Sequence, residues 1–139
     1  MRHGVLLDTG PLVAYFCPTD RFHDWAVSQF AAFAPPVTTC EPVLAESCFL
    51  LARAGVPATR ILAKVTQGAL RIGLNVEREA AAIATLMQRY ADRPMSLADA
   101  CLVRMAEILP GSLCTLDGDF HVYRRHGRTP LDLIVPDRV

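Results

Sequence analysis

Short apolar runs alternate along the chain with longer segments that carry apolar residues at helical spacing. The short runs suit buried strands, and glycine, proline and aspartate residues bound them. We expect strands at Val5–Leu7, Val37–Cys40, Ala69–Leu74, Ser112–Leu116 and Leu131–Val135. The longer segments predict helices at Pro11–Cys17, Phe22–Phe33, Pro42–Ala54, Thr59–Gln67, Glu77–Tyr90 and Ser96–Leu109.

Because strands alternate with helices, the pattern favours an α/β fold in which helices cover a mainly parallel sheet. No internal repeat and no low-complexity linker divides the sequence, so we expect a single domain over residues 1–139. Asp117-Gly118-Asp119 predicts a turn, with Phe120–Tyr123 as a short element after it.

The composition argues against several classes of protein. Formal net charge is zero, so no overall field attracts nucleic acid, and any polyanion must be held by local basic patches or metal ions. The five cysteines are odd in number, widely spaced and without a C-x-x-C motif, which favours buried thiols over disulfides or zinc. No signal peptide and no apolar run of membrane-spanning length is found. We therefore expect a soluble cytoplasmic protein.

Several carboxylates interrupt this apolar pattern. Asp8 ends the first strand, and Asp117 and Asp119 follow the fourth one directly. Glu46 lies in the middle of the Pro42–Ala54 helix among apolar neighbours, and Asp99 lies in the first turn of the most apolar helix. Each has a plain structural explanation: an Asx turn at Asp8, a partly exposed edge at Glu46, a capping box at Asp99 and a simple turn at Asp117.

One hypothesis explains these carboxylates together. The carboxyl ends of parallel strands meet at one edge of a sheet, and helices that follow strands begin there. Carboxylates that converge at such an edge repel one another, and divalent cations relieve that repulsion. Oxygen ligands without Cys or His suit Mg²⁺ or Mn²⁺, which can promote in-line displacement at phosphorus. The hydroxyls of Thr9 and Thr115 are candidates for holding a water of the metal.

The same stretches resemble the PIN-domain ribonucleases, and among them the VapC-type toxins of bacterial toxin–antitoxin pairs. The matching segments, in order and spacing, are Leu7–Leu12, Glu41–Glu46, Ser96–Ala100 and Thr115–Phe120. The resemblance implies a three-layer α/β/α sandwich around a parallel sheet. It implies that Asp8, Glu46, Asp99 and Asp117 form the acidic catalytic set, with metal held by Asp8, Asp99, Asp117 and, as an extra position, Asp119.

The resemblance also implies an activity and partners. The activity is Mg²⁺- or Mn²⁺-dependent cleavage of RNA, with transfer RNA as the favoured target. The partners are a second copy of the chain in a homodimer and a VapB-type antitoxin, which inserts a segment along the active-site groove. Operator DNA is bound only through that antitoxin, and no membrane is involved.

Basic residues are candidates for substrate binding. Arg53 follows Glu46 by seven positions on the same helix. Either it reaches a phosphate beside the metal, or it is a solvated charge that the helix dipole favours at the C-terminal end. Arg124 and Arg125, with His126 and Arg128, cluster after the Asp119 turn. They are candidates for contact with the RNA backbone, with the antitoxin or with water alone.

Two other functions fit parts of the sequence. Asp8-Thr9-Gly10 is also the signature of aspartic proteases, including small retroviral homodimers, but that fold requires an all-β chain. A non-catalytic binding module, such as a PIN fold that only docks partners, is compatible with the same residues. Loss of metal-dependent RNA cleavage in carboxylate variants distinguishes an enzyme from such a scaffold.

Overall fold

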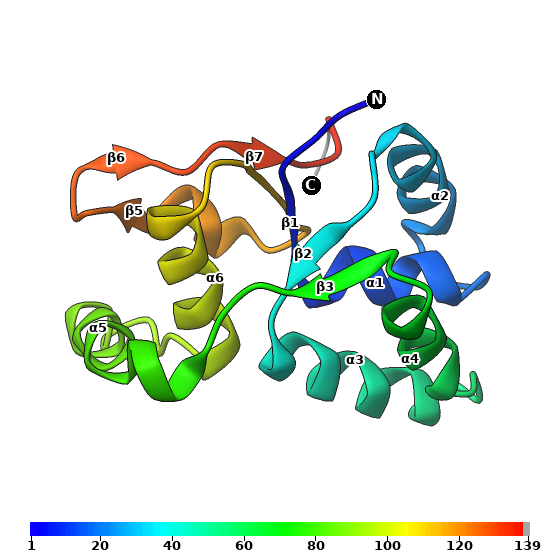
Figure 1. Cartoon of the computed structure of the whole chain (residues 1–139), viewed down its shortest axis with the longest axis horizontal. Coiled ribbons are helices and arrows are strands. Elements are labelled where there is room, and N and C mark those ends of the chain that lie inside the picture. The colour runs from blue at the N-terminus through cyan, green and yellow to red at the C-terminus, as the bar shows by residue number, and fades with distance from the viewer. Residues whose placement is uncertain (138–139) are drawn as a thin grey trace.

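A central parallel sheet organises the chain, as the computed structural model of residues 1–137 shows (Figure 1). Its five strands lie in the order β3-β2-β1-β4-β7, and every neighbouring pair is parallel. The strands are β1 (Val5–Leu7), β2 (Val37–Thr39), β3 (Leu70–Ile72), β4 (Ser112–Cys114) and β7 (Leu133–Ile134). The predicted α/β fold with a central parallel sheet is confirmed.

Helices flank the sheet on both sides (Figure 1). On one side lie α1 (Thr9–Phe16), α2 (His23–Ala32), α3 (Glu41–Arg53) and α4 (Thr59–Thr66). On the other lie α5 (Val76–Arg89) and α6 (Leu97–Ile108), which pack against each other. Because α6 also contacts β1 and β4, it carries its N-terminus to the centre of the fold.

The core is built from the central strands and α6. Val5, Leu6 and Leu7 are all buried, as expected for a parallel strand that is covered on both faces. In α6, the buried residues are Ala98, Ala100, Cys101, Leu102, Val103, Met105 and Ala106. This helix is therefore hydrophobic nearly all round, as a helix in the middle of a core must be.

Polar side chains fix the starts of several helices. The Asp8 carboxylate accepts a hydrogen bond from the backbone N–H of Thr9, and the Ser96 hydroxyl accepts one from the N–H of Asp99. Asn75 does the same for Arg78 at the start of α5. These are N-caps, which satisfy backbone donors that a helix leaves free at its first turn.

Some predicted boundaries are wrong. The first helix begins at Thr9 rather than Pro11, because Asp8 itself is the N-cap and Pro11 lies within the first turn, where it needs no donor. The Gly118–His121 segment is a 3₁₀ helix, η1. A small antiparallel hairpin, β5 (Arg124–Arg125) with β6 (Thr129–Pro130), follows it and is absent from the prediction.

The structure bears on three further expectations, which concern the aspartic protease alternative, the cysteines and the membrane. The mixed fold contradicts the all-β chain that an aspartic protease requires, so that alternative is wrong. All five cysteines are free thiols, and four of them are buried, with Cys48 half-buried. Across residues 1–137, no helix has the length and apolarity to cross a membrane.

Candidate active site

Asp8 is the buried centre of the candidate site. Its side chain is 7% exposed and lies at the end of β1, the middle strand of the sheet. Oδ1 accepts from the Thr9 backbone N–H at 2.7 Å, and Oδ2 accepts from the Thr115 hydroxyl at 2.7 Å. Each oxygen thus accepts one strong hydrogen bond and retains a lone pair for another partner.

Thr115 connects Asp8 to Asp117. Leu7 pairs with Cys114 across the parallel β1–β4 ladder, so the next residues, Asp8 and Thr115, emerge side by side. The Thr115 hydroxyl donates to Asp8 and accepts from the backbone N–H of Asp117 at 3.0 Å. This fully buried hydroxyl therefore fixes the acidic turn relative to the central carboxylate.

Glu46 reaches the site from α3. Its Oε2 accepts a hydrogen bond from the Thr9 hydroxyl at 3.0 Å. Glu46 itself is exposed, which agrees with the partly exposed helix edge that was its plain structural explanation, although its apolar neighbours favour a buried face. Phe49 is 61% exposed and Leu50 is 42% exposed, because α3 buries Val43, Ser47 and Leu51 instead.

Asp99 lies in the first turn of α6. Its backbone N–H is capped by Ser96, as the predicted capping box requires. Its carboxylate does more than complete a cap, because Oδ2 accepts from the hydroxyl of Tyr123 at 3.2 Å. Tyr123 is fully buried and packs edge-on against both Tyr90 and Phe120, so its hydroxyl has a fixed position.

Asp117 and Asp119 lie at the start of η1. Asp117 Oδ1 accepts from the backbone N–H of Asp119 at 2.9 Å, which forms an Asx turn where the Asp-Gly sequence predicts a simple turn. Asp119 forms an ion pair with Arg93 at 3.1 Å. Its carboxylate is therefore held by a cation of this chain, and its role as a metal ligand stays a prediction.

The electrostatics show that these carboxylates converge. The pKa of Asp8 is raised to about 6, chiefly by burial; the hydrogen bonds from Thr115 and Thr9 oppose the rise, and the negative charges of Asp99 and Asp117 add to it. Burial also raises the pKa of Asp99, and the charges of Asp117 and Glu46 add to that rise. Four acidic groups from four parts of the chain thus share one electrostatic environment.

A hard divalent cation fits the chemistry of this site. The converging side chains offer only oxygen donors, and their mutual repulsion is relieved by positive charge. Within residues 1–137, no three Asp, Glu, His or Cys side chains meet in an arrangement that would enclose one ion. Mg²⁺ does not require such a cage, since it commonly takes one or two carboxylates and fills its other positions with water and phosphate oxygens.

The structure places the predicted basic residues outside this hydrogen-bonded network. The Arg53 guanidinium lies over the Phe49 ring at 5.6 Å, at the far end of α3. Arg124 donates to the carbonyl oxygens of His121, Val122 and Tyr123 and so closes the end of η1. Arg125 lies beside it in β5. Their contact with substrate stays a prediction.

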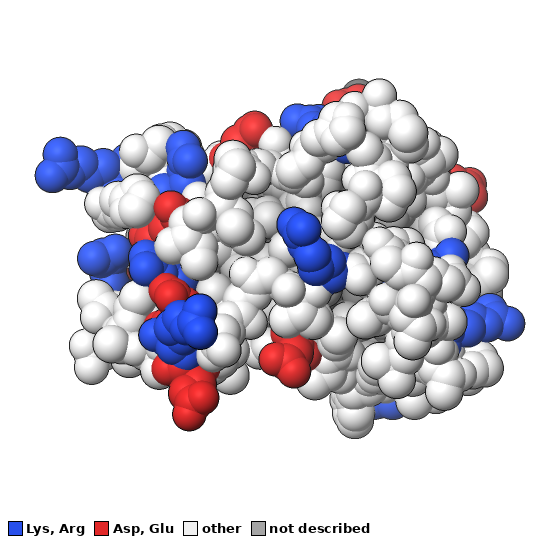
Figure 2. All heavy atoms as spheres, viewed as in Figure 1, with Lys and Arg blue, Asp and Glu red and all other residues white. Residues whose placement is uncertain are grey.

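Basic side chains nevertheless gather at one end of the molecule. Figure 2 shows blue Lys and Arg side chains, with red ones among them, at the end formed by α5, α6 and the β5–β6 hairpin. Part of this charge is neutralised internally, because Arg104 bonds to Glu79 at 2.7 Å and to Glu107 at 3.2 Å.

Sequence reasoning missed Tyr123 and Arg93, which position Asp99 and Asp119. Both lie far from their acidic partners in the sequence, at separations of 24 and 26 residues. An aromatic residue that follows an acidic turn is expected to pack in the core, and only the hydroxyl group of Tyr123 indicates a polar role. The requirement that a buried tyrosine hydroxyl find a partner was the one available clue.

The fold and the acidic edge define a nuclease-type α/β domain. The sequence matches the PIN domain family over residues 5–126, and the chain belongs to that family. PIN domains are generally nucleases that typically use divalent metals. No curated protein matches the chain in sequence.

Asp8→Asn stabilises the metal-free protein near neutral pH. The folded pKa of Asp8 is about 6 against an ordinary value of 3.8, so folding favours the protonated carboxyl. Its ionisation therefore costs stability progressively as the pH rises from about 4 through 6, to roughly 3 kcal/mol above that range.

Chemical unfolding with a chelator present tests this. We expect Asp8→Asn to raise the unfolding free energy by roughly 1 to 3 kcal/mol near pH 7.5, and to give little gain near pH 4. A variant that is less stable than wild type at both pH values would contradict this account of Asp8.

Tyr123→Phe weakens the attachment to α6 of the segment that follows η1. We expect a loss of about 1 kcal/mol in unfolding free energy, because a hydrogen bond to a carboxylate is removed while the ring packing is kept. The loss should shrink when Asp99 is already Asn.

Tyr90→Phe is the matched control. The Tyr90 hydroxyl accepts from the backbone N–H of Arg124, so the loss of unfolding free energy in Tyr90→Phe should be independent of Asp99. If the losses of unfolding free energy from Tyr123→Phe and Asp99→Asn simply add, the hydrogen bond between Tyr123 and Asp99 is contradicted.

Proposed function

We propose that this PIN domain is a Mg²⁺- or Mn²⁺-dependent endoribonuclease. The observation that carries the proposal is the convergence of Asp8, Asp99 and Asp117: the charges of Asp99 and Asp117 raise the pKa of Asp8, and the charge of Asp117 raises the pKa of Asp99. Folding brings these mutually repelling carboxylates together at a cost in free energy. A bound cation would offset that cost by neutralising their charge, so the cluster favours a cation-binding function. The PIN family membership makes phosphodiester hydrolysis the matching reaction.

The residues have distinct roles in this proposal. On this proposal Asp8, Asp99 and Asp117 would supply carboxylates to a hydrated cation, one or two of them directly and the rest through its waters, and Glu46 is the fourth carboxylate of the catalytic set. Thr9 fixes Glu46, and Thr115 fixes Asp8, each through a hydroxyl donor. Bound there, Mg²⁺ or Mn²⁺ supplies the Lewis acidity that stabilises negative charge on the phosphoryl oxygens.

RNA is the substrate that the motif resemblance supports. Because net charge is zero, attraction to RNA depends on local groups rather than on an overall field. The basic end of the molecule around the β5–β6 hairpin supplies such groups for a phosphate backbone. Arg53, Arg124 and Arg125 remain the proposed contacts, and a structured RNA such as a transfer RNA is the proposed target.

The biological role that we propose is that of a VapC-type toxin in the cytoplasm. The order and spacing of the four acidic motifs resemble those of the motifs in these toxins. On this proposal the chain forms a homodimer and is inhibited by a VapB-type antitoxin. Operator DNA is reached only through that antitoxin. The proposal rests on the motifs, and PIN family membership is compatible with it.

Purified protein is expected to cleave RNA only when Mg²⁺ or Mn²⁺ is added. Asp8→Asn and Asp99→Asn should each lower the rate at least about 100-fold, because a metal site supplies several kcal/mol of transition-state stabilisation. The measurement is loss of a labelled RNA pool, followed by mapping of the new ends.

Asp24→Asn is the matched control, since Asp24 is an exposed carboxylate in the first turn of α2. It should cleave like wild type. Equal cleavage by wild type and both active-site variants would assign the activity to a contaminant. A fully folded wild-type protein that cleaves no RNA under these conditions would instead favour the docking module.

Expression of the chain alone is expected to arrest bacterial growth, because unrestrained RNA cleavage stops translation. Expression of Asp8→Asn at the same level should not. Growth curves with matched protein levels test this. Arrest by both proteins would contradict a toxin role that depends on catalysis.

A further inference from the structure

A separate pocket lies on the side of the sheet away from α5 and α6. Its volume is about 260 Å³, and α1, α2, α4 and the β2–β3 edge surround it. It is lined by Leu12, Tyr15, Phe16, Phe30, Phe33, Pro35, Val37, Lys64, Ala69 and Leu70. None of these residues belongs to the acidic site, so the mechanism proposed above does not use the pocket.

Aromatic rings form much of the pocket wall. Tyr15 contacts Phe30 with ring centroids 4.7 Å apart, and Phe30 contacts Phe33 at 5.5 Å. Tyr15 also packs edge-on against Phe16 at 5.0 Å. Each of these rings packs against another ring, so the pocket wall does not depend on one side chain alone. Such walls favour a flat or branched apolar group.

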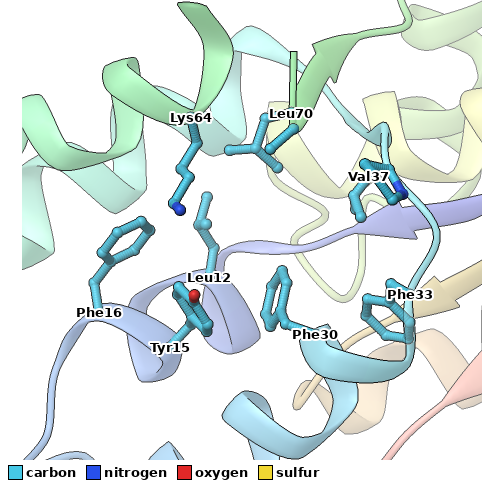
Figure 3. A pocket seen from close by; sticks show the side chains of 10 residues that line it. Leu12, Tyr15, Phe16, Phe30, Phe33, Val37, Lys64 and Leu70 are labelled. Carbon is cyan, nitrogen blue, oxygen red and sulfur yellow. The ribbon is translucent and has the colours of Figure 1, made fainter. Parts of the chain in front are cut away.

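Lys64 is the single charged residue in this lining, and it is the only lysine of the chain. Figure 3 shows its side chain reaching from α4 into the space near Leu12 and Phe16. Within residues 1–137 its ammonium group forms no ion pair, and no carboxylate lines the pocket. A half-buried ammonium beside apolar walls therefore lacks an anionic partner.

We propose that this pocket binds a small amphiphilic carboxylate, with its apolar body among the aromatic rings and its carboxylate on Lys64. The single charge and the apolar remainder match a ligand with one anionic end. The compact volume fits one small molecule, whereas a docked helix needs a long groove that takes anchors at successive turns. This site is independent of the proposed ribonuclease activity.

Isothermal titration calorimetry with 4-phenylbutyrate tests the proposal, and the uncharged 4-phenylbutyramide is the matched probe. We expect the acid to bind wild type at least roughly tenfold more tightly than the amide, because a charged hydrogen bond distinguishes them. Lys64→Met keeps the apolar stem and removes the charge, so it should weaken acid binding about tenfold and abolish the preference.

Arg60→Met is the matched control, because Arg60 lies one turn earlier on α4, is exposed and does not line the pocket. It should retain wild-type affinity and preference. Amide shifts in NMR spectra should concentrate at Ala69 and Leu70. Equal affinity for acid and amide would overturn the proposal, as would a preference that survives Lys64→Met. Absence of binding by the acid up to roughly 10 mM would also overturn it.

Discussion

The burial of one carboxylate at the end of the central strand constrains much of this structure. Asp8 is 7% exposed, and two hydrogen bonds, from the Thr9 backbone and the Thr115 hydroxyl, stabilise it there. Burial still dominates, since the pKa of Asp8 rises to about 6. A fold that keeps a charge in such a place gives up stability, and the adjacent carboxylates increase that loss.

The parallel sheet explains how distant residues reach Asp8. Asp8 and Thr115 emerge together because β1 and β4 are paired in register, and the Asp8 backbone N–H donates to Cys114 at 3.0 Å. Helix α3 follows β2, the other neighbour of β1, and brings Glu46 to Thr9. The α6 helix lies across the core and supplies Asp99 from its first turn. Sheet topology, rather than local sequence, therefore assembles the site.

The sequence predicted what depends on local patterns and on the edge rule for parallel sheets. The apolar runs predicted where the strands lie. Asp8, Asp99 and Asp117 became candidate site residues because they interrupt the apolar pattern. The face that α3 buries could not be predicted, because the helix exposes the apolar residues Phe49 and Leu50 and buries Ser47. Short polar strands such as Arg124–Arg125 carry too few residues for a periodic signal. The Tyr123–Asp99 contact depends on tertiary packing alone.

Helix α1 lies between the two features of functional interest. Its first residue, Thr9, contacts Glu46 at the acidic edge, while Tyr15 and Phe16 near its end line the apolar pocket. The acidic site and the largely apolar pocket thus use opposite ends of one short helix. This separation lets each site be altered without replacing a residue of the other.

Mn²⁺ titration followed by amide NMR tests the central claim most directly, because the paramagnetic ion broadens resonances only near where it binds. The account predicts early, selective broadening at Thr9, Asp99 and Asp117, lost in Asp8→Asn, with Gly68 unaffected. Uniform broadening, or selective broadening centred elsewhere on the molecule, would contradict a single cation site at the acidic edge.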